Sequence, residues 1–139
     1  MNNPSILYPV FALAALTGMV LLLIPFTRVR AVLRREIRAA DFRLGESEAV
    51  PDAVRLPNRN YMNLLELPVL FYVVCLIFYV AAQPTPAAVW LAWAYVGLRA
   101  LHSAVHLTYN HVLHRLGLFA ASNVLLVMLW ILAATRLVR

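Results

Sequence analysis

Residues 59–82 read RNYMNLLELPVLFYVVCLIFYVAA, a nearly continuous apolar segment with polar side chains at its start. At a rise of ~1.5 Å per residue, such a segment can cross the ~30 Å hydrocarbon layer of a bilayer. Arg59, Asn63 and Glu66 interrupt it with the spacing i, i+4 and i+7, which places them on one face of a helix. Ionisable groups at membrane depth are costly, so they persist where they pair, face a cavity or take part in chemistry.

The composition indicates a membrane protein along the whole chain. Of 139 residues, 63% are hydrophobic and 13% are charged, and the mean hydropathy is +0.78. An average soluble domain is about 45–50% apolar and about 25% charged. The length leaves room for one compact bundle and no second domain, so we expect residues 1–139 to form a single membrane domain.

Hydropathy predicts an all-α fold, an integral membrane four-helix up-down bundle with spans at about residues 6–27, 61–82, 87–109 and 116–135. The segment Gln83-Pro84-Thr85-Pro86 predicts a tight turn between the second and third spans, because proline cannot continue a helix. Residues 28–59 are rich in arginine and are expected to form the only long hydrophilic loop. A cleavable signal peptide is the competing interpretation of the first apolar run, but residues 1–5 contain no Lys or Arg.

Positive charge is unevenly distributed between the predicted loops. The net charge is +6, and all of the basic residues are arginines because the chain has no lysine. The first and third loops contain most of them, so the positive-inside rule places these loops in the cytoplasm and the termini on the opposite side. Arg136 and Arg139 count against this orientation. The arginines lie next to membrane spans without a recognition motif, which favours contact with anionic lipid over nucleic-acid binding.

A second polar face is predicted on the third span, where Arg99, His102 and His106 follow the spacing i, i+3 and i+7. We expect Arg99 to lie at the depth of Glu66 and to form an ion pair with it. Hydrogen bonds from Asn63 and His102 would complete this buried cluster. The other interpretation is that the cluster opens at the cytoplasmic rim and binds a small anionic ligand between the helices.

Two histidines one helical turn apart could also bind a metal ion or haem. His111 and His114 lie nearby, but no convincing third ligand accompanies His102 and His106. Histidines that form hydrogen bonds inside the bundle are therefore favoured, and no metal site is expected. A transporter is excluded, because four spans in 139 residues leave no inverted repeat.

The pattern R-x-x-x-N-x-x-E, from Arg59 to Glu66 and followed by Pro68 and an apolar run, resembles the second-helix signature of the MAPEG superfamily. These are the membrane-associated proteins in eicosanoid and glutathione metabolism. The chain length, the four predicted spans, the basic first loop and the Arg-containing third helix agree with this resemblance. The form Asn63-x-x-Glu66-Leu67-Pro68-Val69-Leu70-Phe71, together with Arg99-x-x-His102, is similar to a bacterial branch of the superfamily.

The resemblance implies a homotrimer of four-helix protomers that holds glutathione at each subunit interface, open to the cytoplasm. Arg59, Asn63 and Glu66 match the residues that grip the tripeptide, with the arginine on a carboxylate and the glutamate on the free amine. Arg28 or Arg30 would be the basic residue that the neighbouring subunit contributes. The implied activity is that of a glutathione-dependent transferase or peroxidase on small lipophilic electrophiles, with an arginine that stabilises the thiolate.

The chain departs from the eicosanoid enzymes of the superfamily at positions that help to hold the ligand. His102, His106 and Leu67 stand where those enzymes have tyrosines. Arg115 is the candidate for the activating arginine, although the linker before it differs in length. The alternative hypothesis is a non-catalytic membrane scaffold or lipid-binding bundle, in which the polar faces pair internally and hold no ligand.

Overall fold

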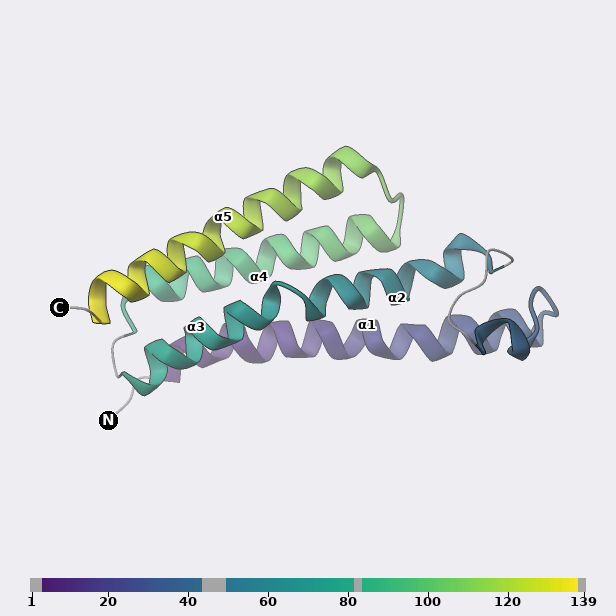
Figure 1. Cartoon of the computed structure of the whole chain (residues 1–139), viewed down its shortest axis with the longest axis horizontal. Coiled ribbons are helices and arrows are strands. Elements are labelled where there is room, and N and C mark those ends of the chain that lie inside the picture. The colour runs from purple at the N-terminus through teal and green to yellow at the C-terminus, as the bar shows by residue number, and fades with distance from the viewer. Residues whose placement is uncertain (1–3, 44–49, 82–83, 138–139) are drawn as a thin grey trace.

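The computed structural model describes residues 4–43, 50–81 and 84–137, and within them the molecule is all-helical (Figure 1). Its helices are α1 (Leu7–Leu33), α2 (Asp52–Leu65), α3 (Pro68–Val80), α4 (Pro86–Leu107) and α5 (Val112–Leu137). Two short 3-10 helices, η1 (Pro4–Ile6) and η2 (Ala39–Phe42), precede and follow α1. Because α2 and α3 run end to end as one broken rod, the molecule is a bundle of four rods, and the predicted fold class is confirmed (Figure 1).

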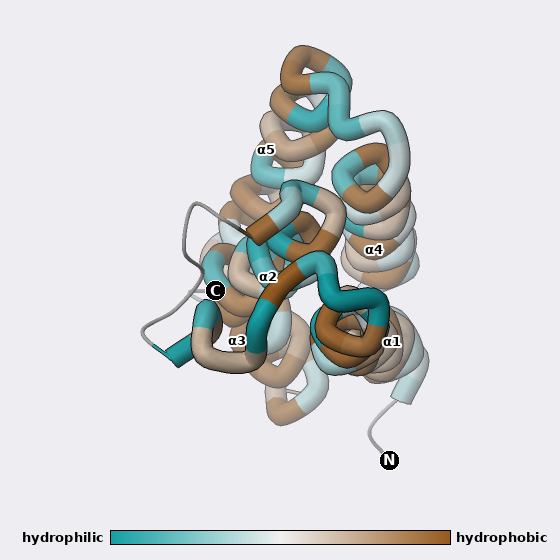
Figure 2. The backbone as a smooth tube through the Cα atoms, turned by 90° about the vertical axis from the view of Figure 1, so that its right-hand side faces the viewer, coloured by the Kyte–Doolittle hydropathy of each residue, from teal (hydrophilic) through white to brown (hydrophobic). Residues whose placement is uncertain are grey.

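Among the described residues, three helical segments are long and apolar enough to cross a membrane, namely Pro4–Leu33, Asp52–Val80 and Val112–Arg136. Helix α4 is 22 residues long, and its polar and basic side chains lower its hydropathy. Helix α4 packs beside α5 in both views of the backbone, so it is part of the same bundle as the apolar helices (Figure 1, Figure 2). Ala82 and Gln83, at the predicted turn, and Arg139 lie outside the described residues.

The helices extend beyond the predicted spans at the arginine-rich end. Helix α1 continues to Leu33 rather than ending near residue 27, and α2 begins at Asp52 rather than near residue 61. The prediction that residues 28–59 form one loop is therefore wrong in its extent, because arginine is a good helix former and does not end a helix. Helices α1 and α2 consequently project beyond the α4–α5 hairpin (Figure 1). A small apolar cluster supports this projection, formed by Ala31, Ile37, Val50 and Val54.

The second span is broken in its middle, between α2 and α3. Pro68 has no backbone N–H, and its ring would clash with the carbonyl of the preceding turn, so α2 ends at Leu65 and α3 begins at Pro68. Glu66 has a backbone φ of −77° and ψ of −102°, which lies outside the helical region. The single helix predicted through residues 61–82 is thus corrected to two helices with a break at Glu66 and Leu67.

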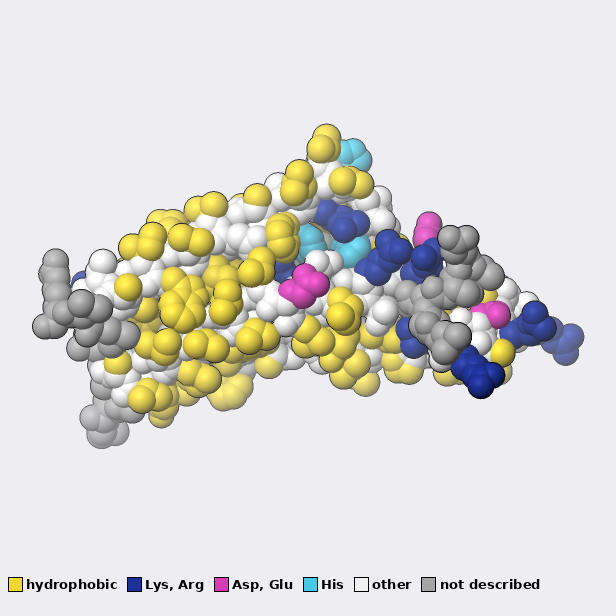
Figure 3. All heavy atoms as spheres, in the orientation of Figure 1, with side chains coloured by type: hydrophobic (Ala, Val, Ile, Leu, Met, Phe, Trp, Pro, Cys, Tyr) yellow, Lys and Arg dark blue, Asp and Glu magenta, His cyan; other side chains and the backbone are white. Residues whose placement is uncertain are grey.

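The two ends of the bundle differ in character. The first turn of α1, the last turn of α5 and the start of α4 lie at one end, whereas η2 and the α4–α5 link lie towards the other, as an up-down bundle requires (Figure 1). Arginines gather at the second end, beyond an apolar middle (Figure 3). Figure 2 looks along the bundle from that end and shows many hydrophilic residues in the turns closest to the viewer. The assignment of this end to the cytoplasm stays a prediction.

Candidate functional site

The polar residues predicted on α2 and α4 meet at the break in the second span. Arg99 of α4 is fully buried, and its Nη2 donates a 2.5 Å hydrogen bond to the backbone carbonyl of Asn63. In an unbroken helix that carbonyl would accept from the N–H of Leu67. The break caused by Pro68 therefore leaves the Asn63 carbonyl available to a side chain from another helix.

The predicted ion pair between Glu66 and Arg99 is not formed. Glu66 is exposed in the protomer, and it has no ion pair with any residue in the described part of the chain. Glu66 still belongs to the last turn of α2, because its N–H donates a 3.2 Å hydrogen bond to the carbonyl of Met62, but its side chain is exposed whereas Arg99 is buried. Arg99 instead contacts peptide oxygen at the C-terminal end of α2, where the helix dipole is negative.

A cavity of about 230 Å³ lies beside this contact, between α2, α4 and α5. Its lining consists of Asn63, His102, Val112, Arg115, Leu116 and Phe119. The Nη1 of Arg115 donates a 2.6 Å hydrogen bond to Oδ1 of Asn110, which holds the guanidinium near the α4–α5 link. The structure thus brings the predicted residues Asn63, His102 and Arg115 to one cavity from three different helices.

His102 and His106 are buried one turn apart on α4, and their ring centroids are 5.8 Å apart. In both rings Nδ1 is buried and has no hydrogen-bond partner among the described residues, so the predicted internal hydrogen bonds are not formed at these atoms. The ring of Phe119 lies 6.1 Å from that of His102. Within the described ranges, no three His, Cys, Asp or Glu side chains gather as metal ligands would.

Arg59 is exposed on α2, and it is not among the residues that line the cavity. The side-chain Nδ2 of Asn63 donates a 3.1 Å hydrogen bond to the backbone carbonyl of Arg59, which ties the two motif residues together. Sequence reasoning missed Asn60, which is fully buried and accepts a 3.2 Å hydrogen bond from Oγ of Ser103. Spacing was the available signal, because Ser103 lies one turn after Arg99 on the same helical face.

The chain matches the MAPEG family model over residues 6–135. It belongs to the MAPEG family. No curated protein and no solved structure matches it. Together with the three apolar segments, membership of a membrane family makes the chain an integral membrane protein, and the resemblance carried by the second-span motif is confirmed. The MAPEG family is generally associated with glutathione, and this gives the polar cavity a class of ligand to be tested against.

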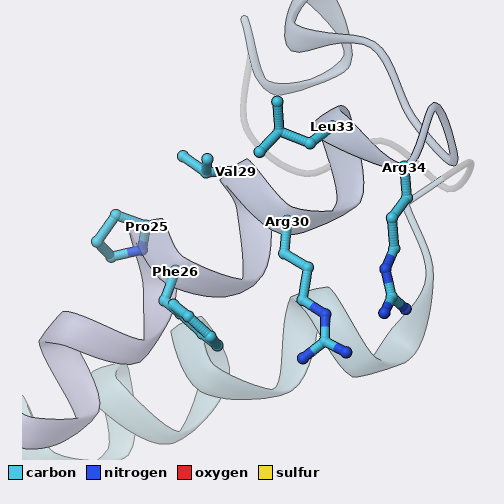
Figure 4. A pocket seen from close by; sticks show the side chains of 6 residues that line it. All are labelled: Pro25, Phe26, Val29, Arg30, Leu33 and Arg34. Carbon is cyan, nitrogen blue, oxygen red and sulfur yellow. The ribbon is translucent and has the colours of Figure 1, made fainter.

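The two arginines that the MAPEG resemblance assigns to a neighbouring subunit lie apart from this cavity. Arg28 lies over the ring of Phe42, with its guanidinium carbon 4.7 Å from the ring centroid. Arg30 lines a separate, open hollow of about 710 Å³ on α1, where it extends beside Arg34 (Figure 4). Apolar side chains complete this hollow, namely Pro25, Phe26, Val29 and Leu33. The contribution of Arg28 or Arg30 to a second protomer stays a prediction.

Proposed function

We propose that this protein is a glutathione-dependent transferase or peroxidase that acts on lipophilic electrophiles arriving through the bilayer. The observation that carries the proposal is the cavity between α2, α4 and α5, which Asn63 of the motif shares with His102 and Arg115. Membership of the MAPEG family supports a thiol tripeptide as the polar ligand.

Buried polar atoms around the cavity support an anionic ligand that forms hydrogen bonds. The Nε of Arg115 and the Nδ1 of His102 have no partner among the described residues, although buried polar groups normally have one. The exposed Arg59 offers a planar donor for a carboxylate at the rim, and the unpaired Glu66 offers an acceptor for an ammonium group. This set of groups fits glutathione, which has two carboxylates, one amine and a thiol.

The size of the cavity supports a site that a second subunit completes. Its volume of about 230 Å³ is below the ~300–1,000 Å³ typical of small-molecule pockets. Arg30 lies on the open face of α1, beside Arg34, where an adjacent protomer could meet it (Figure 4). The proposal therefore includes a homotrimer in which Arg28 or Arg30 of one protomer serves the glutathione site of the next.

In the proposed chemistry, Arg115 stabilises the glutathione thiolate at the cavity wall. In the transferase reaction, sulfur forms a bond to an electrophilic carbon, the leaving group departs with the bonding electrons, and the thiol proton passes to solvent. In the peroxidase reaction, two thiols reduce one hydroperoxide to an alcohol and water and become a disulfide. Membrane lipid around the helices supplies the route by which lipophilic substrates reach either reaction.

Thermal unfolding of the detergent-purified protein, with and without millimolar glutathione, tests this proposal. A ligand at 100 times its Kd adds about 2.7 kcal/mol of stability, so we expect a clear rise in the unfolding temperature. An equimolar mixture of glutamate, cysteine and glycine is the control, because it supplies the same groups without their linkage. No rise with glutathione, and no conjugation of a lipophilic halonitroaromatic, would favour the non-catalytic scaffold or lipid-binding bundle.

A further inference from the structure

One face of α4 contacts the broken span on both sides of its break. Tyr95, Arg99 and Ser103 follow one another at i, i+4 and i+8, and all three are buried. Tyr95 stacks on Phe71 of α3, with ring centroids 4.6 Å apart and ring planes at 15°. Ser103 donates its hydrogen bond to Asn60 of α2. The continuous helix α4 therefore holds the two halves of the broken span in a fixed relation.

Arg99 occupies the middle of this face, at the break itself. Pro68 ends the helical hydrogen bonding, so the Asn63 carbonyl does not receive the N–H of Leu67 that an unbroken helix would supply. The Nη2 of Arg99 takes the place of that N–H. Its positive charge also lies at the negative end of the α2 dipole, where a cation is stabilising.

A fully buried arginine that forms no ion pair is costly to retain. Arg99 forms no ion pair in the described part of the chain, and its Nε and Nη1 have no hydrogen-bond partner there. Phe119 of α5 covers the guanidinium, whose carbon lies 5.7 Å from the ring centroid. A methionine could fill this space without burying a charge, so the contact with the Asn63 carbonyl is what distinguishes the arginine.

We propose that Arg99 is a positioning residue that caps the broken end of α2, and thereby holds Asn63 in place at the cavity and fixes the end of α2 that carries Glu66. Arg99 is not among the residues that line the cavity, so it acts on a ligand through Asn63 rather than by touching it. This inference rests on the proposed function for what the motif binds. It replaces the sequence-based assignment of Arg99 as a ligand-binding residue.

The test is a double-mutant cycle between Arg99 and Pro68. Pro68→Ala removes the ring and supplies an N–H, so that the helix can run through and the Leu67 N–H can reach the Asn63 carbonyl. Arg99→Met keeps a long side chain but removes every donor. The wild type, both single variants and the double variant are compared in detergent by their unfolding temperature without ligand and by the rise that glutathione causes.

We expect Arg99→Met to lower the unfolding temperature by about 5–10 °C in the wild-type background, because a buried carbonyl loses its donor. The loss should be much smaller in the Pro68→Ala background, where Leu67 supplies the donor. The rise caused by glutathione should disappear in Arg99→Met and should not return in the double variant, because a straight helix presents Asn63 and Glu66 differently. If the double variant recovers its stability but not the rise caused by glutathione, Arg99 positions the site and does not only stabilise the fold.

Equal losses of stability in the two backgrounds would overturn the cap. Recovery of the glutathione response together with stability would overturn the positioning role and leave a structural one. If the wild type does not respond to glutathione, the proposed function fails, and deuterium exchange at the Leu67 amide then decides the cap. Slower exchange of the Leu67 amide in Pro68→Ala, together with a smaller loss of stability from Arg99→Met in that background, supports the cap. Unchanged exchange at this amide overturns it. If Arg99→Met does not fold, Arg99→Lys enters the same cycle with a smaller expected loss.

Discussion

Arginine serves two different regions of this molecule. At the projecting end of α1, Arg30 and Arg34 are exposed, and their side chains extend in the same direction (Figure 4). At the break between α2 and α3, Arg99 is fully buried and its guanidinium meets a peptide carbonyl. The first environment solvates the charge at little cost, whereas the second keeps it only through directed contacts.

The difference shows that residue type alone does not assign a role to a basic side chain in this bundle. An exposed arginine near a membrane end fits the positive-inside rule and contact with anionic lipid, and many positions could supply it. The buried Arg99 depends on the geometry of one proline-induced break. Substitutions in the two regions should therefore differ greatly in their effects, and the following experiments measure that difference.

Charge reversal at the break should give the largest effect. Arg99→Glu would bury a carboxylate against the negative end of α2 and remove the donor to the Asn63 carbonyl, at a cost of about 3–5 kcal/mol. We expect little folded protein, measured as monodisperse material after detergent extraction. The matched control is Arg34→Glu at the exposed end, which should extract like the wild type. Equal yields from both variants would remove the contrast between the two regions.

The next effect concerns the ligand rather than the fold. Glu66→Gln keeps the shape of an exposed side chain and removes its charge, so assembly should be nearly unchanged. Loss of an ammonium contact should weaken glutathione binding by about 2–3 kcal/mol, which calorimetry on the purified protein would detect. Loss of the oligomer with an unchanged glutathione response in the surviving material would instead assign Glu66 a structural role.

The sequence was sufficient for the fold class and for part of the cavity lining. Apolar runs of membrane-spanning length predicted the bundle, and the motif around Asn63 predicted the family. Helical spacing also selected His102. Asn63, His102 and Arg115 line one cavity. Such inferences succeed because hydropathy and helical periodicity are local properties of the chain.

The missed features depend on contacts between distant segments. Pro68 was visible in the sequence, but whether a proline kinks or divides a helix depends on the groups that satisfy the carbonyls of the preceding turn. Here Arg99 donates to the Asn63 carbonyl at this break, and the exposed Glu66 forms no ion pair with it. Phe119 gave no signal because it is one aromatic residue within an apolar helix, and only packing places it over Arg99.

A smaller effect is expected at Arg59, which is exposed on α2 one helical turn before Asn63 of the cavity. Arg59→Lys keeps the positive charge and the membrane orientation but loses the planar pair of donors that fits a carboxylate. Glutathione binding should weaken by roughly 1–2 kcal/mol, with insertion and oligomer formation unchanged. Titration of both proteins by thermal shift measures this difference. Equal affinities would exclude Arg59 from the site and leave it among the exposed arginines.

The smallest effect should come from the exposed end itself. Arg34 forms an ion pair with Glu36 at 3.9 Å, and the two side chains are 57% and 47% exposed. Water and salt screen such a pair, so Arg34→Ala should change the stability by less than about 0.5 kcal/mol, a shift near the resolution of a thermal melt. The informative measurement is binding to vesicles with and without anionic lipid, where loss of one cation near the surface should weaken the electrostatic contribution by about 1 kcal/mol. A large loss of stability in detergent would mean that this face of α1 is buried against another protomer. Arg34 would then resemble the buried Arg99 more than its exposure in the single chain indicates.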